Sequence, residues 1–186
     1  TVRREIYRQL NDKEGEERLA WEIFRSHRSV ERLDELLQTL GEEQRETVIA
    51  GEATLILDSS QKSLIESDAS FLLKLNNIDA AEQYLMNRIA LLNNIDYIIL
   101  TEWVVQFAQN SLLASLIYRQ LLNDILNRGY AKAYHYGVDY WFQLQQLSPQ
   151  VSDWGSNLTH QQYQQKVNQE HGRKYSFWKQ VSERGG

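Results

Sequence analysis

The sequence predicts an all-α protein, an α–α superhelix of stacked antiparallel helical hairpins that is tetratricopeptide-like. One proline and nine glycines in 186 residues leave few chain-breaking positions, and alternating β-branched residues are rare. Four consecutive stretches carry polar residues at helical spacing, with apolar residues around most of the remaining circumference. Each such helix needs several covering neighbours, since a helix on a two-layer surface needs only one apolar stripe. A stack of about nine to eleven helices provides that cover.

The N-terminal helices are expected within residues 1–58. One helix is predicted over 14–25, and a second begins after Ser29 and ends at Gly41, because serine caps helix N-termini and glycine follows helix C-termini. A third is expected over 42–58. A loop and a shorter helix over 67–75 follow.

The central residues, 66–147, are predicted to form a helical-hairpin repeat core. An offset of 34 residues places Ala80 on Ala114 and Tyr84 on Tyr118, which is typical of the second helix of tetratricopeptide-like repeats. The first-helix Trp/Leu/Gly pattern and the closing proline of those repeats are missing. A helix over 79–92 is expected to begin with a capping box of Asp79 and Glu82. The polar stripes are 79, 83, 87; 102, 106, 110; 115, 119, 123, 127; and 132, 135, 139, 143, 146.

The last 40 residues begin with a loop over 148–159, which contains Pro149 and Gly155. Thr159 is expected to cap a closing pair of helices over 161–169 and 173–182, within residues 160–183. The three groups of helices are predicted to make one domain, residues 1–186.

A resemblance to a known family is carried by the C-terminal third. It rests on Leu121–Leu126, Ala131–Tyr136, the spacing of Tyr140, Leu144 and Leu147, then His160, Tyr163, His171–Lys174 and Phe177-Trp178. Over residues 112–181 the chain resembles an uncharacterised bacterial helical-repeat family, a domain of unknown function. This C-terminal region is similar to the tails of some proteins bearing SWIM-type zinc fingers. The resemblance implies a helical fold and no established activity, and the cysteines of a SWIM finger are missing here.

Composition excludes several classes of function. A net charge of −5 disfavours general binding to nucleic acid or to membrane surfaces, which needs a basic face. The sequence contains no cysteine, which excludes disulfides and thiolate chemistry and fits a reducing, cytoplasmic location. No apolar run approaches the roughly 20 residues that span a bilayer.

One candidate binding site is the turn that contains His171, Arg173 and Lys174. If one helix ends at Gly172 and another begins at Arg173, free backbone N–H groups and two cations meet there, which suits a phosphate or carboxylate. The alternative is a helix–helix turn whose arginine pairs with a neighbouring acid. Residues 147–186 carry five basic and three acidic side chains, so this is the one basic part of the chain.

A second hypothesis concerns His135 and Asp139, which lie one helical turn apart and could share a metal ion or a proton. No HExxH spacing exists, so we assign no metal site and keep the pair only as weak candidates. The aromatic residues around Tyr134–Phe142 are interpreted as core, since Lys132 is the only cation on that helix. The clustered acids of the first 46 residues are interpreted as solvated helix starts.

The sequence therefore favours a protein–protein interaction or scaffold domain with a protein or peptide partner, and a binding role over an enzyme. No catalytic residue and no cofactor is predicted. The alternatives are a nucleic-acid-associated accessory protein that uses the basic C-terminal turn, and a metal-dependent enzyme that uses His135, Asp139 and His171. The oligomeric state and the pathway are left open.

Overall fold

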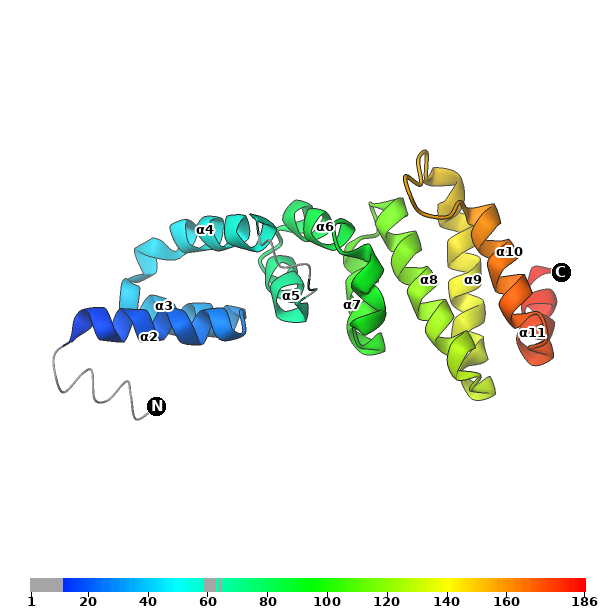
Figure 1. Cartoon of the computed structure of the whole chain (residues 1–186), viewed down its shortest axis with the longest axis horizontal. Helices are drawn as coiled ribbons and strands as arrows, with labels where there is room; N and C mark the ends of the chain where they lie inside the picture. Colours follow the sequence, from blue (N-terminus) through cyan, green and yellow to red (C-terminus); the bar gives the residue numbers. More distant parts are fainter. Residues whose placement is uncertain (1–11, 59–62, 64) are drawn as a thin grey trace. The chain divides into compact units, whose positions relative to one another are not determined.

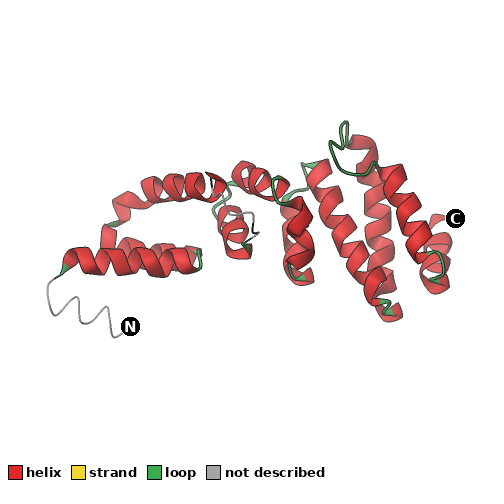
Figure 2. Ribbon diagram, viewed as in Figure 1, coloured by secondary structure: helices red, strands yellow, loops and turns green. Residues whose placement is uncertain are grey.

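The structure is a computed structural model that describes residues 12–58, 63 and 65–186. These residues form ten α-helices and four 3₁₀ helices, and the described part of the chain contains no strand (Figure 1 and Figure 2). The all-α prediction is confirmed. The chain divides into two compact units, Thr1–Arg88 and Ile89–Gly186, and the single-domain assignment stays a prediction.

The described residues of the first unit form five α-helices and one 3₁₀ helix. They are α2 (Lys13–Ser26), α3 (Val30–Leu40), the 3₁₀ helix η1 (Glu42–Gln44), α4 (Arg45–Asp58), α5 (Glu66–Lys74) and α6 (Ile78–Met86). The predicted cap is present, because the Ser29 hydroxyl accepts a hydrogen bond from the Arg32 N–H at 3.2 Å. Gly41 follows α3 at φ 102°, a backbone conformation that favours glycine.

The core of this unit lies between the α2–α3 and α5–α6 pairs and α4. Phe24 of α2 and Phe71 of α5 pack edge to face with ring centroids 5.5 Å apart, and both side chains are buried. Leu33, Leu36 and Leu37 bury the apolar face of α3. Tyr84 of α6 is also buried, and its hydroxyl accepts a hydrogen bond from the Ile65 N–H at 3.0 Å.

The second unit follows the same plan with longer helices. They are the 3₁₀ helix η2 (Ile89–Asn94), α7 (Tyr97–Gln106), α8 (Ser111–Arg128), η3 (Ala131–Ala133), α9 (Tyr134–Leu147), η4 (Ser148–Gln150), α10 (His160–His171) and α11 (Tyr175–Gly185). Helix α8 packs against both α7 and α9, and α11 packs against α9 (Figure 1). The predicted Thr159 cap is present and forms a full capping box with Gln162.

The aromatic residues of the C-terminal third close the core of this unit. Tyr134, Trp141, Tyr163 and Phe177 are all buried, and Trp178 packs against the same cluster. Trp141 and Trp178 meet edge to face with centroids 5.2 Å apart. The interpretation of the aromatic helix as core therefore agrees with the buried positions, whereas Tyr130 and Tyr136 are exposed.

Two local predictions in the middle of the chain are wrong. The helix expected over 79–92 ends at Met86, because the Arg88 N–H donates to the Leu85 carbonyl and the backbone tightens toward the 3₁₀ helix η2. The cap of α6 is Asn77, whose side chain accepts from the Ala80 N–H, and not Asp79. Part of the loop predicted before residue 67 lies outside the described residues.

Among the described residues, no helix combines the length and the apolar character that crossing a membrane needs.

Candidate functional site

A surface groove in the first unit is the candidate functional site. It has a volume of about 400 Å³ and lies between α2, the end of α3 and α4. Its apolar lining is supplied by Trp21, Leu40, Val48 and Leu55. Leu55 is 50% exposed although it belongs to a helix with apolar residues around most of its circumference. The groove therefore leaves one apolar face of α4 uncovered.

Gly51 forms the open part of the groove wall on α4. A Cβ atom added at this position would meet no heavy atom within 4 Å, so the space above the backbone is free. Glycine in a helix interior costs about 1 kcal/mol relative to alanine. Here it widens the groove, because any side chain at position 51 would project into it.

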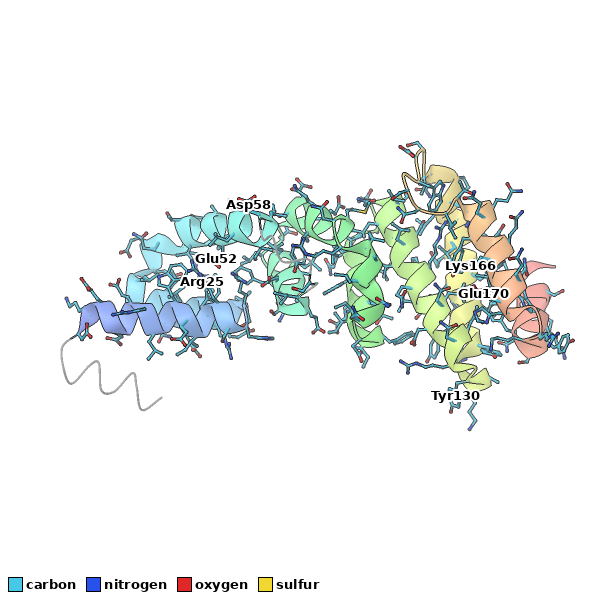
Figure 3. The ribbon with its side chains drawn as sticks, in the orientation of Figure 1. Arg25, Glu52, Asp58, Tyr130, Lys166 and Glu170 are labelled. Carbon is cyan, nitrogen blue, oxygen red and sulfur yellow. The ribbon has the colours of Figure 1, made fainter. Side chains whose placement is uncertain are left out.

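A network of four charged side chains holds the groove walls together. The Glu52 carboxylate accepts hydrogen bonds from Arg25 Nε at 2.9 Å and Nη2 at 2.6 Å, and from Arg28 Nε at 2.8 Å. Arg28 Nη1 also donates to Asp68 at 2.8 Å. Arg25 and Glu52 come from facing helices, α2 and α4 (Figure 3). The network therefore ties the α2–α3 hairpin to α4 and α5.

The acids of this network are deeply buried, with Glu52 1% and Asp68 4% exposed. Burial by itself lowers the pKa of Arg28, but the hydrogen bond to Glu52 and the charge of Asp68 outweigh it and raise that pKa. Two arginines and two acids leave the cluster neutral. Each buried acid is therefore paired with at least one arginine.

The groove lining combines apolar side chains with polar and charged ones, among them Glu17, Arg25, Thr47 and Glu52. The Arg25 guanidinium lies 4.5 Å from the Trp21 ring centroid. Glu17 is an exposed acidic residue of the lining, whereas the other acid, Glu52, is buried and paired with arginines.

The predicted basic turn lies at the other end of the chain, between α10 and α11. His171 is the last residue of α10, and its carbonyl accepts from the Lys174 N–H and from Trp178 Nε1, both at 3.0 Å. Helix α11 begins at Tyr175 and not at Arg173, so Lys174 is its N-cap residue. Arg173 is exposed and Lys174 half-buried. The anion site there stays a prediction.

The two weak metal candidates point to different partners. His135 is exposed, with Nδ1 2.9 Å from the Lys132 carbonyl oxygen, and its ring stacks on Tyr136. The Asp139 carboxylate forms an ion pair with Arg184. Within the described part of the chain, no group of three or more His, Cys, Asp or Glu side chains is arranged to hold a metal ion.

Two histidines are expected to make the stability of the protein depend on pH. Burial, and then the charge of Arg119, lower the pKa of His160 below its ordinary value of 6.5, and burial and Lys174 lower the pKa of His171. As pH falls through 6.5, the unfolded chain binds protons that the folded chain does not, so the free energy of unfolding decreases. We expect the urea midpoint to fall between about pH 7.5 and 5.5.

Substitutions of histidines distinguish the contribution of His160 and His171 from that of other groups that bind protons in this pH range. The double substitution His160→Gln/His171→Gln is expected to flatten the decline, whereas substitution of the exposed His27 by glutamine leaves it unchanged. An equal decline in the double variant would contradict the assignment.

The described residues define an all-helical protein with a partly apolar surface groove in its first unit. The chain belongs to the family of unknown function DUF6880, whose family model matches residues 1–180. A search of curated proteins finds no match, and a search of solved structures finds none either. The similarity to SWIM-protein tails stays a prediction.

Sequence reasoning missed the groove residues. The sequence of residues 45–58 indicates a broad apolar face, because Val48 and Leu55, and likewise Ile49 and Ile56, lie seven positions apart on neighbouring rows of one helix. A lone acid among them, Glu52, indicates a buried ion pair, since an unpaired buried carboxylate is costly.

Proposed function

We propose that this protein is a protein-binding scaffold domain, and that the groove between α2, α3 and α4 holds a short helical segment of its partner. The observation that supports the proposal is the uncovered apolar face of α4, with Gly51 and the half-exposed Leu55 opening into about 400 Å³. Helix-in-groove recognition uses such a surface, with apolar anchors at helical spacing. A stacked, tetratricopeptide-like superhelix and a cytoplasmic location are part of the same proposal.

The chemistry of the partner follows from the surface around the groove. Trp21, Val48 and Leu55 provide apolar contacts, which suit two or three apolar side chains on one face of a helix. The exposed Glu17 of the lining favours a segment that carries lysine or arginine beside these apolar side chains. The partner is therefore expected to present a basic amphipathic helix.

Substitution Gly51→Leu tests the groove directly. The new side chain enters free space and a helix interior gains a better helix former, so the variant is expected to fold at least as stably as the native protein. It also fills the groove. We expect partner capture from the native host to be lost, and the purified partner to bind about tenfold more weakly or worse by calorimetry.

The matched control is Ala50→Leu, which adds the same side chain at the neighbouring exposed position outside the groove. This control is expected to retain the partner with an affinity within about twofold of the native protein. If both variants retain the partner equally, the groove is not its binding site.

A further inference from the structure

Arg119 is a buried arginine in the second unit, far along the chain from the groove of the first. Its side chain extends from α8 and is only 6% exposed. The guanidinium carbon lies 4.1 Å from the centroid of the Trp154 ring and 4.7 Å from that of Tyr163. Aromatic rings therefore pack against the guanidinium, and the edges of its plane are left for hydrogen bonding.

Only one of the three guanidinium nitrogens of Arg119 donates a hydrogen bond. Nη1 donates to the Leu158 carbonyl at 2.7 Å, whereas Nε and Nη2 are buried and have no hydrogen-bond partner. These two nitrogens form the side-on fork that binds both oxygens of a carboxylate. Arg25 of this same chain uses the corresponding Nε and Nη2 atoms to bind Glu52. The Arg119 fork lacks such a partner.

The charge of Arg119 is also uncompensated. Among the described residues it forms no ion pair, in contrast to the Arg25–Arg28 network. Burial lowers its pKa to about 10, which reflects a charge removed from water. Leaving a buried charge unpaired is costly, so a ligand that supplies the counter-charge gains a strong interaction.

Two further buried polar atoms lie near Arg119 without partners. Ser115 Oγ is one helical turn earlier on α8, and Nδ1 of His160 belongs to the first residue of α10. Burial, and then the positive charge of Arg119, lower the pKa of His160, so the two side chains interact electrostatically. The unused hydrogen-bonding capacity is therefore concentrated between α8 and the start of α10.

A groove of about 200 Å³ borders this cluster, and Arg119 is one of its lining residues. Leu92 and Leu116 give it apolar walls, while Asn123, Asn157 and Lys166 add polar groups and a second cation. No acidic residue lines it. Lys166 projects from α10 and has Glu170 one turn away, with 4.0 Å between charged atoms (Figure 3). The lining suits an anion with an apolar body.

We propose that Arg119 binds the carboxylate of a small organic acid through its Nε and Nη2 atoms, and that the apolar body of the acid occupies the adjacent groove. A carboxylate fits better than phosphate, because the fork offers two parallel donors and half of the groove is apolar. Since both nitrogens are buried, the side chains that cover them must move to admit the acid.

Hexanoate is a suitable probe, with hexanol and inorganic phosphate as comparisons. In NMR titrations of the full chain, hexanoate is expected to bind saturably below about 10 mM and to shift the Arg119 Nε–H resonance downfield. Hexanol and phosphate are expected to bind about tenfold more weakly or not at all. No saturable hexanoate binding, or equal binding of phosphate, would overturn the proposal.

Two variants test the role of the fork. Arg119→Lys keeps the charge but loses the two-donor fork, so hexanoate affinity is expected to fall by about tenfold or more. Lys179→Ala, at an exposed ion pair on α11, is the control and is expected to leave affinity unchanged. Arg119→Gln serves if the lysine variant does not fold, as judged by circular dichroism. Unchanged hexanoate affinity in a folded Arg119 variant would contradict the assignment.

Discussion

Substitution Phe177→Ala is expected to destabilise the second unit by about 3–5 kcal/mol, the largest effect of any single core truncation considered for α11. Phe177 is fully buried and is the one buried residue of that helix. Its ring meets those of Tyr134, Trp141 and Trp178 edge to face at centroid distances of 5.8, 6.5 and 5.0 Å. Removing it leaves a cavity whose aromatic walls cannot close without moving α9 or α11.

Gly137 of α9 shows why the cavity left by Phe177→Ala cannot close easily. A Cβ added there would lie 3.3 Å from both Phe177 Cε2 and Ile125 Cγ2, so α11 packs directly on the α9 backbone. Urea unfolding followed by near-ultraviolet circular dichroism, which reports on Trp141 and Trp178, measures the loss. Tyr175→Ala on the same helix is the control, since Tyr175 is 78% exposed, and is expected to change stability by less than about 0.5 kcal/mol. Similar losses in both variants would contradict this packing.

Helix ends were predictable where a local chemical rule determines them. Ser29, Gly41 and Thr159 act through hydrogen bonds or backbone conformations within three or four residues, so the sequence alone contains the relevant information. Met86 was missed as a helix end. Arg88, just beyond it, donates from Nε to the carbonyl of Ser63, 25 positions earlier, and local periodicity does not report such a contact.

The candidate sites were less predictable for a related reason. Ser115 and Arg119 fall on a polar stripe that looks like a solvated helix face, yet both are buried, and Arg119 contacts Leu158 and Tyr163 of a later segment. Periodicity identifies which residues share a face and does not show what covers that face. The predicted turn at His171–Lys174 has the residues of an anion site, but its backbone donors at Lys174 and Phe177 bond within the turn.

Glu52→Gln is expected to destabilise the first unit by about 3–5 kcal/mol, the range for breaking a buried ion pair by removing one partner. Glutamine keeps nearly the same volume, so the loss reports on charge and hydrogen bonding. Glutamine keeps one oxygen acceptor and replaces the other oxygen by an NH2 donor, so either the two Arg25 donors or Arg28 Nε lose their acceptor and face a donor. Arg28, whose side chain is 14% exposed, also loses the charge of one of its two acidic partners. Urea unfolding at neutral pH measures the change.

The matched control is Asp34→Asn, which removes an acid from the surface ion pair with Arg45, where the side chains are 52% and 32% exposed. Exposed pairs contribute about 0–1 kcal/mol, so this variant should remain close to the native stability. The difference between the two losses of stability compares a buried ion pair with an exposed one in the same protein. Equal, small losses would mean that the Arg25–Glu52–Arg28 network does not support the groove walls. If Glu52→Gln alone loses much stability and also binds the partner more weakly, the ion-pair network supports the groove that it borders.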